Sequence, residues 1–154
     1  MLLRIIYFIT LVFTSFAGFA QENTKPGYDA ALAKKLGADA YGMKQYVMVI
    51  LVTGKAAIED KALKDSLFAG HMKNIGRLAK EGKLVVAGPY GKNDLNYRGV
   101  FVFNTASVEE TKAMVGTDPA VLAGIFDAIY IPWYCTAGLV EVNGIHEKVQ
   151  KTSF

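Results

Sequence analysis

The sequence predicts a single α+β domain whose helices cover one side of an antiparallel sheet. Apolar, β-branched runs of strand length alternate with longer stretches that repeat apolar residues at helical spacing. Glycine, proline or short polar turns separate these segments. The chain has 154 residues, of which 52% are hydrophobic, and this length suits one domain with one core.

Residues 1–20 have the pattern of an export signal. Arg4 precedes an apolar run at residues 5–16, and residues 18–20 form a small-x-small cleavage site. Because a membrane-spanning helix needs about 20 apolar residues, an uncleaved anchor is the less favoured alternative. We expect a periplasmic or secreted mature protein of 134 residues (154 minus 20), without a membrane partner after cleavage.

A linker and a tail flank the expected domain, which spans residues 44–142. Residues 21–43 are polar and rich in small residues, with one helical stretch expected at residues 28–36. Residues 143–154 read as a polar C-terminal tail in which His146 is solvated.

The first half of the domain predicts a strand, a helix and a second strand. Residues 46–53 are a continuous apolar run typical of a central strand. Residues 56–81 predict a helix that ends at Gly82. The second strand, residues 84–87, ends at the Gly-Pro pair 88–89 because proline cannot donate to a ladder. The expected inward face of the helix comprises Leu63, Leu67, His71, Ile75, Leu78 and Ala79.

The second half predicts a strand, two helical segments and a last strand. After a polar turn, residues 98–103 form a third strand that pairs with the second as a hairpin. Ser107 and Glu110 form a capping box that opens a helix. Asp118, followed by proline, caps a further short helix. Residues 125–142 then read as a last extended region.

This order of elements predicts the split β-α-β, or ferredoxin-like, arrangement of helices on a four-stranded antiparallel sheet. Helices cover one face of such a sheet. Because the strands are apolar at nearly every position, the other face would be a large exposed apolar patch in a monomer. We therefore expect a homodimer whose sheets pack face to face.

His71 is the residue of the helix that most needs an explanation. It lies within the apolar face, and burying an imidazole without a partner for its N–H costs roughly a few kcal/mol. A lone histidine in such a position is more often a satisfied core residue than a reacting group. The residues alone therefore favour a structural role and leave a functional one open.

The composition argues against several classes of function. The formal net charge is +3, or +2 once Arg4 is removed with the leader, and no basic stripe indicates a nucleic acid partner. Two distant histidines and a single cysteine, Cys135, give no metal-ligand spacing and no intrachain disulfide. The chain has no phosphate-binding loop and no dinucleotide fingerprint, so we expect no cofactor.

Several segments carry a resemblance to a known family. The helix with His71 is followed by Gly82-Lys-Leu-Val-Val-Ala-Gly-Pro89, Arg98-Gly-Val-Phe-Val-Phe103, Asp118-Pro-Ala-Val-Leu-Ala-Gly124 and Ile131-Pro-Trp-Tyr134. Together, between residues 46 and 139, these pieces resemble the YCII-related proteins of the dimeric α+β barrel superfamily. The resemblance implies a ferredoxin-like dimer with a small-molecule pocket between helices and sheet.

The resemblance also implies a site. In the family, a helical histidine and the aspartate of an Asp-Pro motif have been suggested as an acid–base pair, and by position these are His71 and Asp118. A carboxylate that accepts the imidazole N–H fixes the tautomer and leaves the other nitrogen free to take a proton from a substrate. Alternatively, Asp118 only caps its helix, which is worth about 1 kcal/mol, and satisfies a buried histidine.

Two functions follow from this site. One is a cofactor-free isomerase or lyase that transfers a proton on a small cyclic or aromatic substrate. The other is a non-catalytic dimer that binds a small apolar ligand with the same residues. Haem binding through His71 is a third and less favoured possibility, implied by the superfamily alone.

Four further residues are candidates for substrate binding. Gly88 and Pro89 suit the rim of a pocket, and Tyr90 follows them directly. Trp133 suits stacking on a flat substrate. A plain strand end explains the first two residues as well, and a core or dimer-interface position is the commoner role for such a tryptophan.

Overall fold

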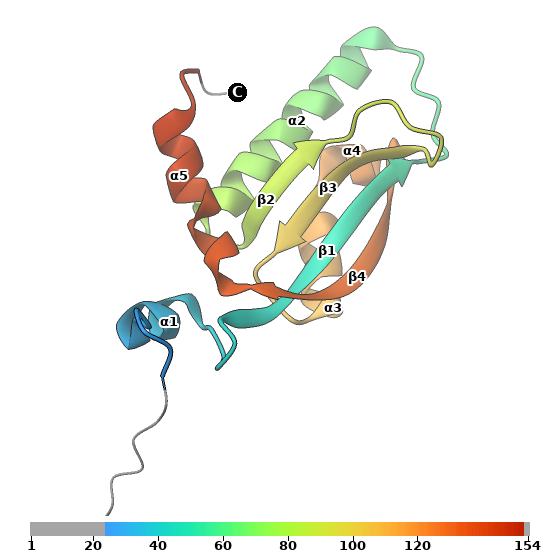
Figure 1. The fold of residues 1–154 in the computed structure, drawn as a ribbon. Coiled ribbons are helices and arrows are strands. Elements are labelled where there is room, and N and C mark those ends of the chain that lie inside the picture. Colours follow the sequence, from blue (N-terminus) through green and yellow to red (C-terminus); the bar gives the residue numbers. More distant parts are fainter. Residues whose placement is uncertain (1–23, 153–154) are drawn as a thin grey trace, which may run out of the picture.

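The structure, a computed structural model, describes residues 24–152, so the expected export signal at residues 1–20 lies outside the described residues. An antiparallel four-stranded sheet of order β2-β3-β1-β4 forms its centre (Figure 1). The strands are β1 (Met43–Thr53), β2 (Leu84–Pro89), β3 (Tyr97–Phe103) and β4 (Phe126–Thr136). Helices connect β1 to β2 and β3 to β4, and this confirms the ferredoxin-like arrangement.

Helices cover only one face of the sheet, which is the rear face in Figure 1. The covering helices are α2 (Lys61–Lys80), α3 (Val108–Val115) and α4 (Pro119–Leu122). A short helix, α1 (Ala30–Leu36), stands apart near the start of β1. After β4 the chain forms the 3-10 helix η1 (Ala137–Glu141) and α5 (Val142–Val149), which lies beside the edge strand β2.

The residues of β1 alternate between the two faces of the sheet. Val47, Val49 and Leu51 point toward the helices. They form the main core, whose other buried members are Leu78, Leu84, Phe101, Phe103 and Val115. This core therefore lies between the sheet and the helix layer, where α2 and the α3–α4 segment are held against the strands.

Helix α2 has clear signals at both ends. Asp60 caps its first turn by accepting from the backbone N–H of Ala62 and Leu63. At the other end, Gly82 has a positive φ of 69°, and the N–H of the residue after it donates to the carbonyl of Leu78. The helix begins at Lys61, later than expected. Leu63 is 49% exposed, so its predicted place on the inward face is wrong and that face begins one turn later.

A bulge in β2 changes which face its residues occupy. Leu84 pairs with Phe103, whereas Val86 pairs with the preceding residue of β3, Val102. The register shift leaves Leu84 on the helix side and turns Val86 and Gly88 to the opposite side. The strand runs on through Pro89, two residues further than expected, because an edge strand tolerates a proline at its end.

The end of β4 differs from the expectation that residues 125–142 are extended. The side chain of Thr136 accepts from the N–H of Gly138 and starts η1. Leu139 and Val140 of η1 then cover one end of the sheet face opposite the helices. The residues beneath and beside them are Tyr46, Val85, Val102, Trp133 and Cys135. The expected tail is helical in α5, and His146 is exposed there.

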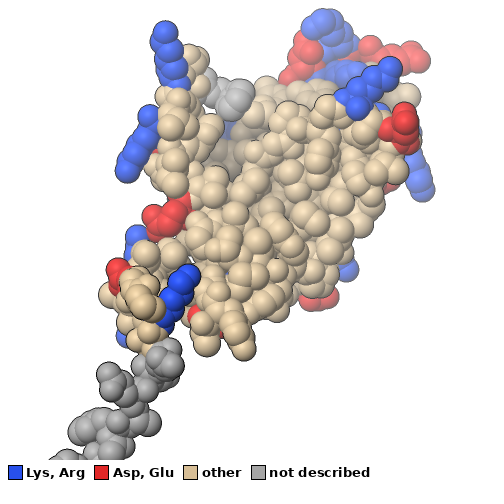
Figure 2. Space-filling model, in the orientation of Figure 1, with Lys and Arg blue, Asp and Glu red and all other residues tan. Residues whose placement is uncertain are grey.

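The rest of the open sheet face is apolar, and none of the described helices covers it. Met48 pairs with Ile131 across β1 and β4, and Ile50 pairs with Ile129 and Val100. Figure 2 shows this face almost without charged side chains, which gather at its rim. Ile129 is 42% exposed. The face is thus the large apolar patch that the strand composition predicts.

Candidate active site

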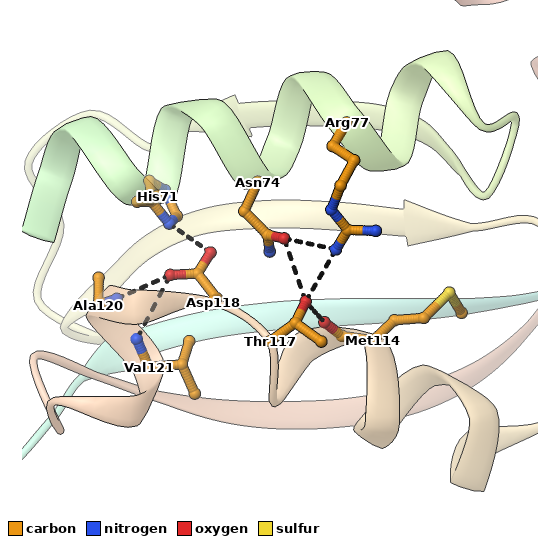
Figure 3. Close-up of polar contacts among 8 residues, drawn as sticks. All are labelled: His71, Asn74, Arg77, Met114, Thr117, Asp118, Ala120 and Val121. Atoms are coloured by element: carbon orange, nitrogen blue, oxygen red, sulfur yellow. Dashed lines mark hydrogen bonds and ion pairs between the residues drawn. The ribbon is translucent and has the colours of Figure 1, made fainter.

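The imidazole of His71 and the carboxylate of Asp118 form a buried hydrogen-bonded pair (Figure 3). The Nδ1 of His71 lies 2.7 Å from Oδ2 of Asp118, a distance typical of a charge-assisted bond. His71 is 8% exposed and Asp118 is 1% exposed. The middle of α2 supplies the histidine and the N-cap of α4 supplies the aspartate, so the two sequence candidates are brought together.

Asp118 also caps its own helix. Its Oδ1 accepts from the backbone N–H of Ala120 at 2.9 Å and of Val121 at 3.4 Å. The helix cap and the contact with His71 therefore use different oxygens of one carboxylate. The cap fixes the side-chain rotamer and thereby aims Oδ2 at the imidazole.

The surroundings of Asp118 favour its ionised form. Burial is the largest influence and raises the pKa of the carboxyl, but the hydrogen bond and charge of His71 and the N–H groups of Ala120 and Val121 outweigh it. The pKa of Asp118 is therefore lowered from its ordinary value. An ionised carboxylate can only accept, so the bond requires the proton on Nδ1 of His71. In a neutral imidazole, Nε2 is then the free base.

Three phenylalanine rings surround the imidazole. Their centroids lie 6.4 Å (Phe68), 5.9 Å (Phe101) and 5.4 Å (Phe126) from the centroid of the His71 ring. The Nε2 atom has no hydrogen-bond partner among the described residues. In that part of the chain, every fully buried side-chain nitrogen or oxygen has a partner. Nε2 is therefore not fully buried, and its aromatic neighbours are apolar.

A second polar group lies one helical turn along α2, beside the pair (Figure 3). Arg77 donates through Nη2 to the side-chain oxygen of Asn74 at 2.7 Å and to Oγ1 of Thr117 at 3.0 Å. Thr117 precedes Asp118, so this group ties the start of α4 to α2. No motif in the sequence predicts this group. The spacing of Asn74 and Arg77, three and six residues after His71, was the only available signal.

The other predicted site residues do not gather around the pair. Gly88 and Trp133 face the open side of the sheet, because they pair with Val100 and Tyr46 respectively, whereas His71 lies on the helix side. In one protomer they cannot share a pocket with the imidazole. Both residues therefore lie on the open face, and their role in binding a substrate stays a prediction.

Pro89 lies at the outer end of β2, on the side of the helix layer, and Tyr90 follows it. Ala87, two residues before Pro89, pairs with Phe101, whose ring is close to His71. Ala87 and Pro89 are both exposed, so the helices leave this end of the strand uncovered. Tyr90 is half-exposed and its ring lies 6.1 Å from that of Tyr97. Their role in binding stays a prediction.

Two surface hollows lie away from the pair. One is at the start of α3, between Lys83 and Glu110, and the other is between α1 and η1. Within residues 24–152, no group of three or more His, Cys, Asp or Glu side chains is placed to hold a metal ion. The described helices include none that is long and apolar enough to cross a membrane.

The fold and the site define a class of protein. It is a ferredoxin-like α+β domain in which a titratable pair lies between α2 and the start of α4. Residues 46–134 match the YCII-related domain family. The match covers more than half of the chain, and the chain belongs to this family. The resemblance seen in the sequence is thereby confirmed.

Among solved structures, the chain is similar to 5-chloro-2-hydroxyhydroquinone dehydrochlorinase (TftG) from Burkholderia phenoliruptrix AC1100, in complex with 2,5-dihydroxybenzoquinone. The identity is 23%, over 56% of this chain and 92% of that chain, with a TM-score of 0.40. No curated protein matches the chain.

Proposed function

We propose that this YCII-related protein is an exported enzyme that moves a proton on a small cyclic or aromatic substrate, as an isomerase or a lyase that needs no cofactor for this step. His71 acts as the base and Asp118 orients it. The observation that supports this proposal is the 2.7 Å bond between Nδ1 and Oδ2, which engages Nδ1 and leaves Nε2 without a partner among the described residues. The assignment to an exported compartment rests on the pattern of residues 1–20.

The chemistry is a single proton transfer followed by its return. Nε2 of His71 takes a proton from a substrate carbon or hydroxyl, and the electron pair of the broken bond stays on the substrate. The imidazolium that forms is stabilised by the ionised Asp118 at Nδ1. In an isomerase the proton returns to a different substrate atom. In a lyase the substrate electron pair expels a leaving group, which the same proton can neutralise.

The surroundings of the base favour an apolar, planar substrate. Phe68 and Phe126 are only partly buried beside the imidazole and offer ring faces and edges for stacking. The nearby cation, Arg77, is already engaged by Glu81 and Asn74 and is poorly placed to bind an anionic substrate. A neutral ring, or one that carries hydroxyl or carbonyl groups, fits these neighbours best.

The protein acts as a homodimer in this proposal. The open sheet face is apolar, nearly free of charge and covered by η1 at only one end. Specific interfaces bury about 1,600 Å² in total, and a four-stranded face is large enough for an interface of that order. A second copy with the same face is the complementary partner, and Trp133 and Gly88 would then lie in or beside the interface.

A substrate screen tests the proposed function directly. Wild type and His71→Asn are supplied with ring lactones and halogenated phenols, and products are followed by mass spectrometry. We expect turnover of at least one class by the wild type and none by His71→Asn. Saturable binding of such compounds without turnover by the wild type would contradict the enzyme and favour a ligand-binding protein.

A further inference from the structure

Three consecutive residues before and at the start of α4 contact α2 in order. The Oγ1 of Thr117 lies 3.1 Å from the side-chain oxygen of Asn74. Asp118 binds His71. The ring of the third residue, Pro119, rests against α2 at Gly70. The acid–base pair thus lies between a polar attachment on one side and a close steric contact on the other.

The contact at Gly70 leaves no room for a side chain. A Cβ atom at this position would lie 2.8 Å from Cγ and 3.2 Å from Cβ of Pro119. The obstacle is a closed pyrrolidine ring at the first position of α4, not the end of a flexible side chain. Any side chain at residue 70 would therefore push α2 and the start of α4 apart.

The size of that displacement matters for the pair. Ordinary contact begins at 3.4 Å, so relief of the closest overlap requires a shift of about 0.6 Å (3.4 minus 2.8). Transmitted in full, such a shift would lengthen the bond between His71 and Asp118 from 2.7 Å to about 3.3 Å (2.7 plus 0.6). Charge-assisted bonds of this type are about 2.7–2.9 Å long, so the bond would weaken and would hold the tautomer and orientation of the imidazole less firmly.

We propose that Gly70 is a positioning residue of the active site: the absence of its side chain sets the spacing between α2 and α4 that allows Asp118 to orient His71. This inference rests on the proposed function for its catalytic meaning, but its geometric content can be tested without a substrate. Gly70 itself touches neither the imidazole nor a reacting atom.

The chain offers a matched control in the same helix. Gly76 also lies within α2, and a Cβ atom there would have nothing within 4 Å. Alanine raises helix propensity at both positions, so the difference between Gly70→Ala and Gly76→Ala isolates the contact with Pro119. A double variant, Gly70→Ala with Pro119→Ala, removes the Cγ atom that makes the closest overlap.

The readout is the Nδ1–H proton of His71 in nitrogen-edited NMR spectra. The chain has only two histidines, so His146→Gln as the common background leaves one imidazole to observe. We expect a downfield, slowly exchanging resonance in that background and with Gly76→Ala. With Gly70→Ala it should move upfield and exchange faster, and the double variant should restore it in part. An unchanged resonance with Gly70→Ala would overturn the proposal.

Two further outcomes are decisive. If Gly70→Ala does not fold, the double variant decides the question. A double variant that folds and shows the downfield resonance supports the role of the Gly70–Pro119 contact. A double variant that is equally unfolded overturns that role. With any substrate found in the screen, Gly70→Ala should lower kcat by roughly tenfold or more with little change in KM. Absence of a substrate for the wild type would count against the proposed function while leaving the NMR result on Gly70 intact.

Discussion

Asp118 lies 47 residues after His71 in the sequence, yet its Oδ2 atom is 2.7 Å from the Nδ1 of that histidine. The other oxygen of the carboxylate caps α4. The side chain of Asp118 therefore contributes both to the stability of the fold and to the proposed chemistry. Experiments on this pair must separate its effect on stability from its effect on activity.

Removal of the imidazole should destabilise the fold. His71→Ala opens a space beside Phe101 and Phe126 and leaves Oδ2 of Asp118 buried without its partner. We expect the free energy of unfolding to fall by about 1–3 kcal/mol in denaturant titrations. His146→Ala, at an exposed position of α5, is the control and should change it little. Equal stability of wild type and His71→Ala would mean that the pair contributes nothing to the fold.

Acid should remove the contribution of Asp118. Its pKa is lowered in the folded state, whereas an unfolded aspartate has a pKa of about 3.9. The ionised form therefore stabilises the fold above about pH 4, and this stabilisation is lost as the pH falls through the folded-state pKa. We expect the difference in unfolding free energy between wild type and Asp118→Asn to shrink as the pH falls from about 6 to about 2.

Other carboxyls do not obscure this comparison. The pKa values of Asp39 and Glu81 are also lowered, chiefly by hydrogen bonds from Tyr134 and Lys83. Both groups are present in wild type and variant, so their effects cancel in the difference. A difference that stays constant over the whole pH range would show that the pair does not hold Asp118 in its ionised form.

A charge on the open sheet face should prevent dimerisation. Ile129→Lys places an ammonium group within the proposed interface on the open face, where burying it is costly. Leu122→Lys is the control, because Leu122 is 71% exposed on α4, in the helix layer. Sedimentation analysis should show dimers for wild type and Leu122→Lys and monomers for Ile129→Lys. Dimers of all three would place the interface elsewhere, and a monomeric wild type would refute the dimer.

Val102 is a less suitable position for that test. It faces the open side, as the register with Met48 requires, but it is buried in the cluster against which Leu139 and Val140 of η1 pack. The adjacent Phe103 is fully buried against the helices. A charge at either position would disturb the core of one protomer, and loss of the dimer could not be separated from loss of the fold.

The strand and helix order was predictable because each element has a local signal. Ser107 accepts from the N–H of Glu110 as the capping pattern predicts, although the Glu110 carboxylate accepts from Thr105 and does not complete the reciprocal half of the box. The end of β4 was not predictable in this way. Its apolar residues continue into η1, and only the hydroxyl of Thr136 marks the change.

The candidate site was only partly predictable. His71 was identified by its place in an apolar helix face, and Asp118 by resemblance to the family. The side of the sheet on which Gly88 lies was not predictable, because the bulge between Leu84 and Val86 reverses the alternation of faces in β2 and no local pattern in the sequence indicates a bulge. The role of Gly70 depends on how closely α2 approaches Pro119, which is a property of the tertiary structure.

The measurement that tests the central claim most directly is the melting temperature and turnover of Asp118→Asn, made side by side with His71→Asn. Asparagine keeps an oxygen for the N–H of Ala120, so the cap survives. Its amide nitrogen donates where the carboxylate accepted, which favours the tautomer with the proton on Nε2 and removes the base. We expect Asp118→Asn to melt within a few degrees of wild type and to lose turnover nearly as completely as His71→Asn. A stable and fully active Asp118→Asn would contradict the acid–base pair and leave Asp118 as a helix cap.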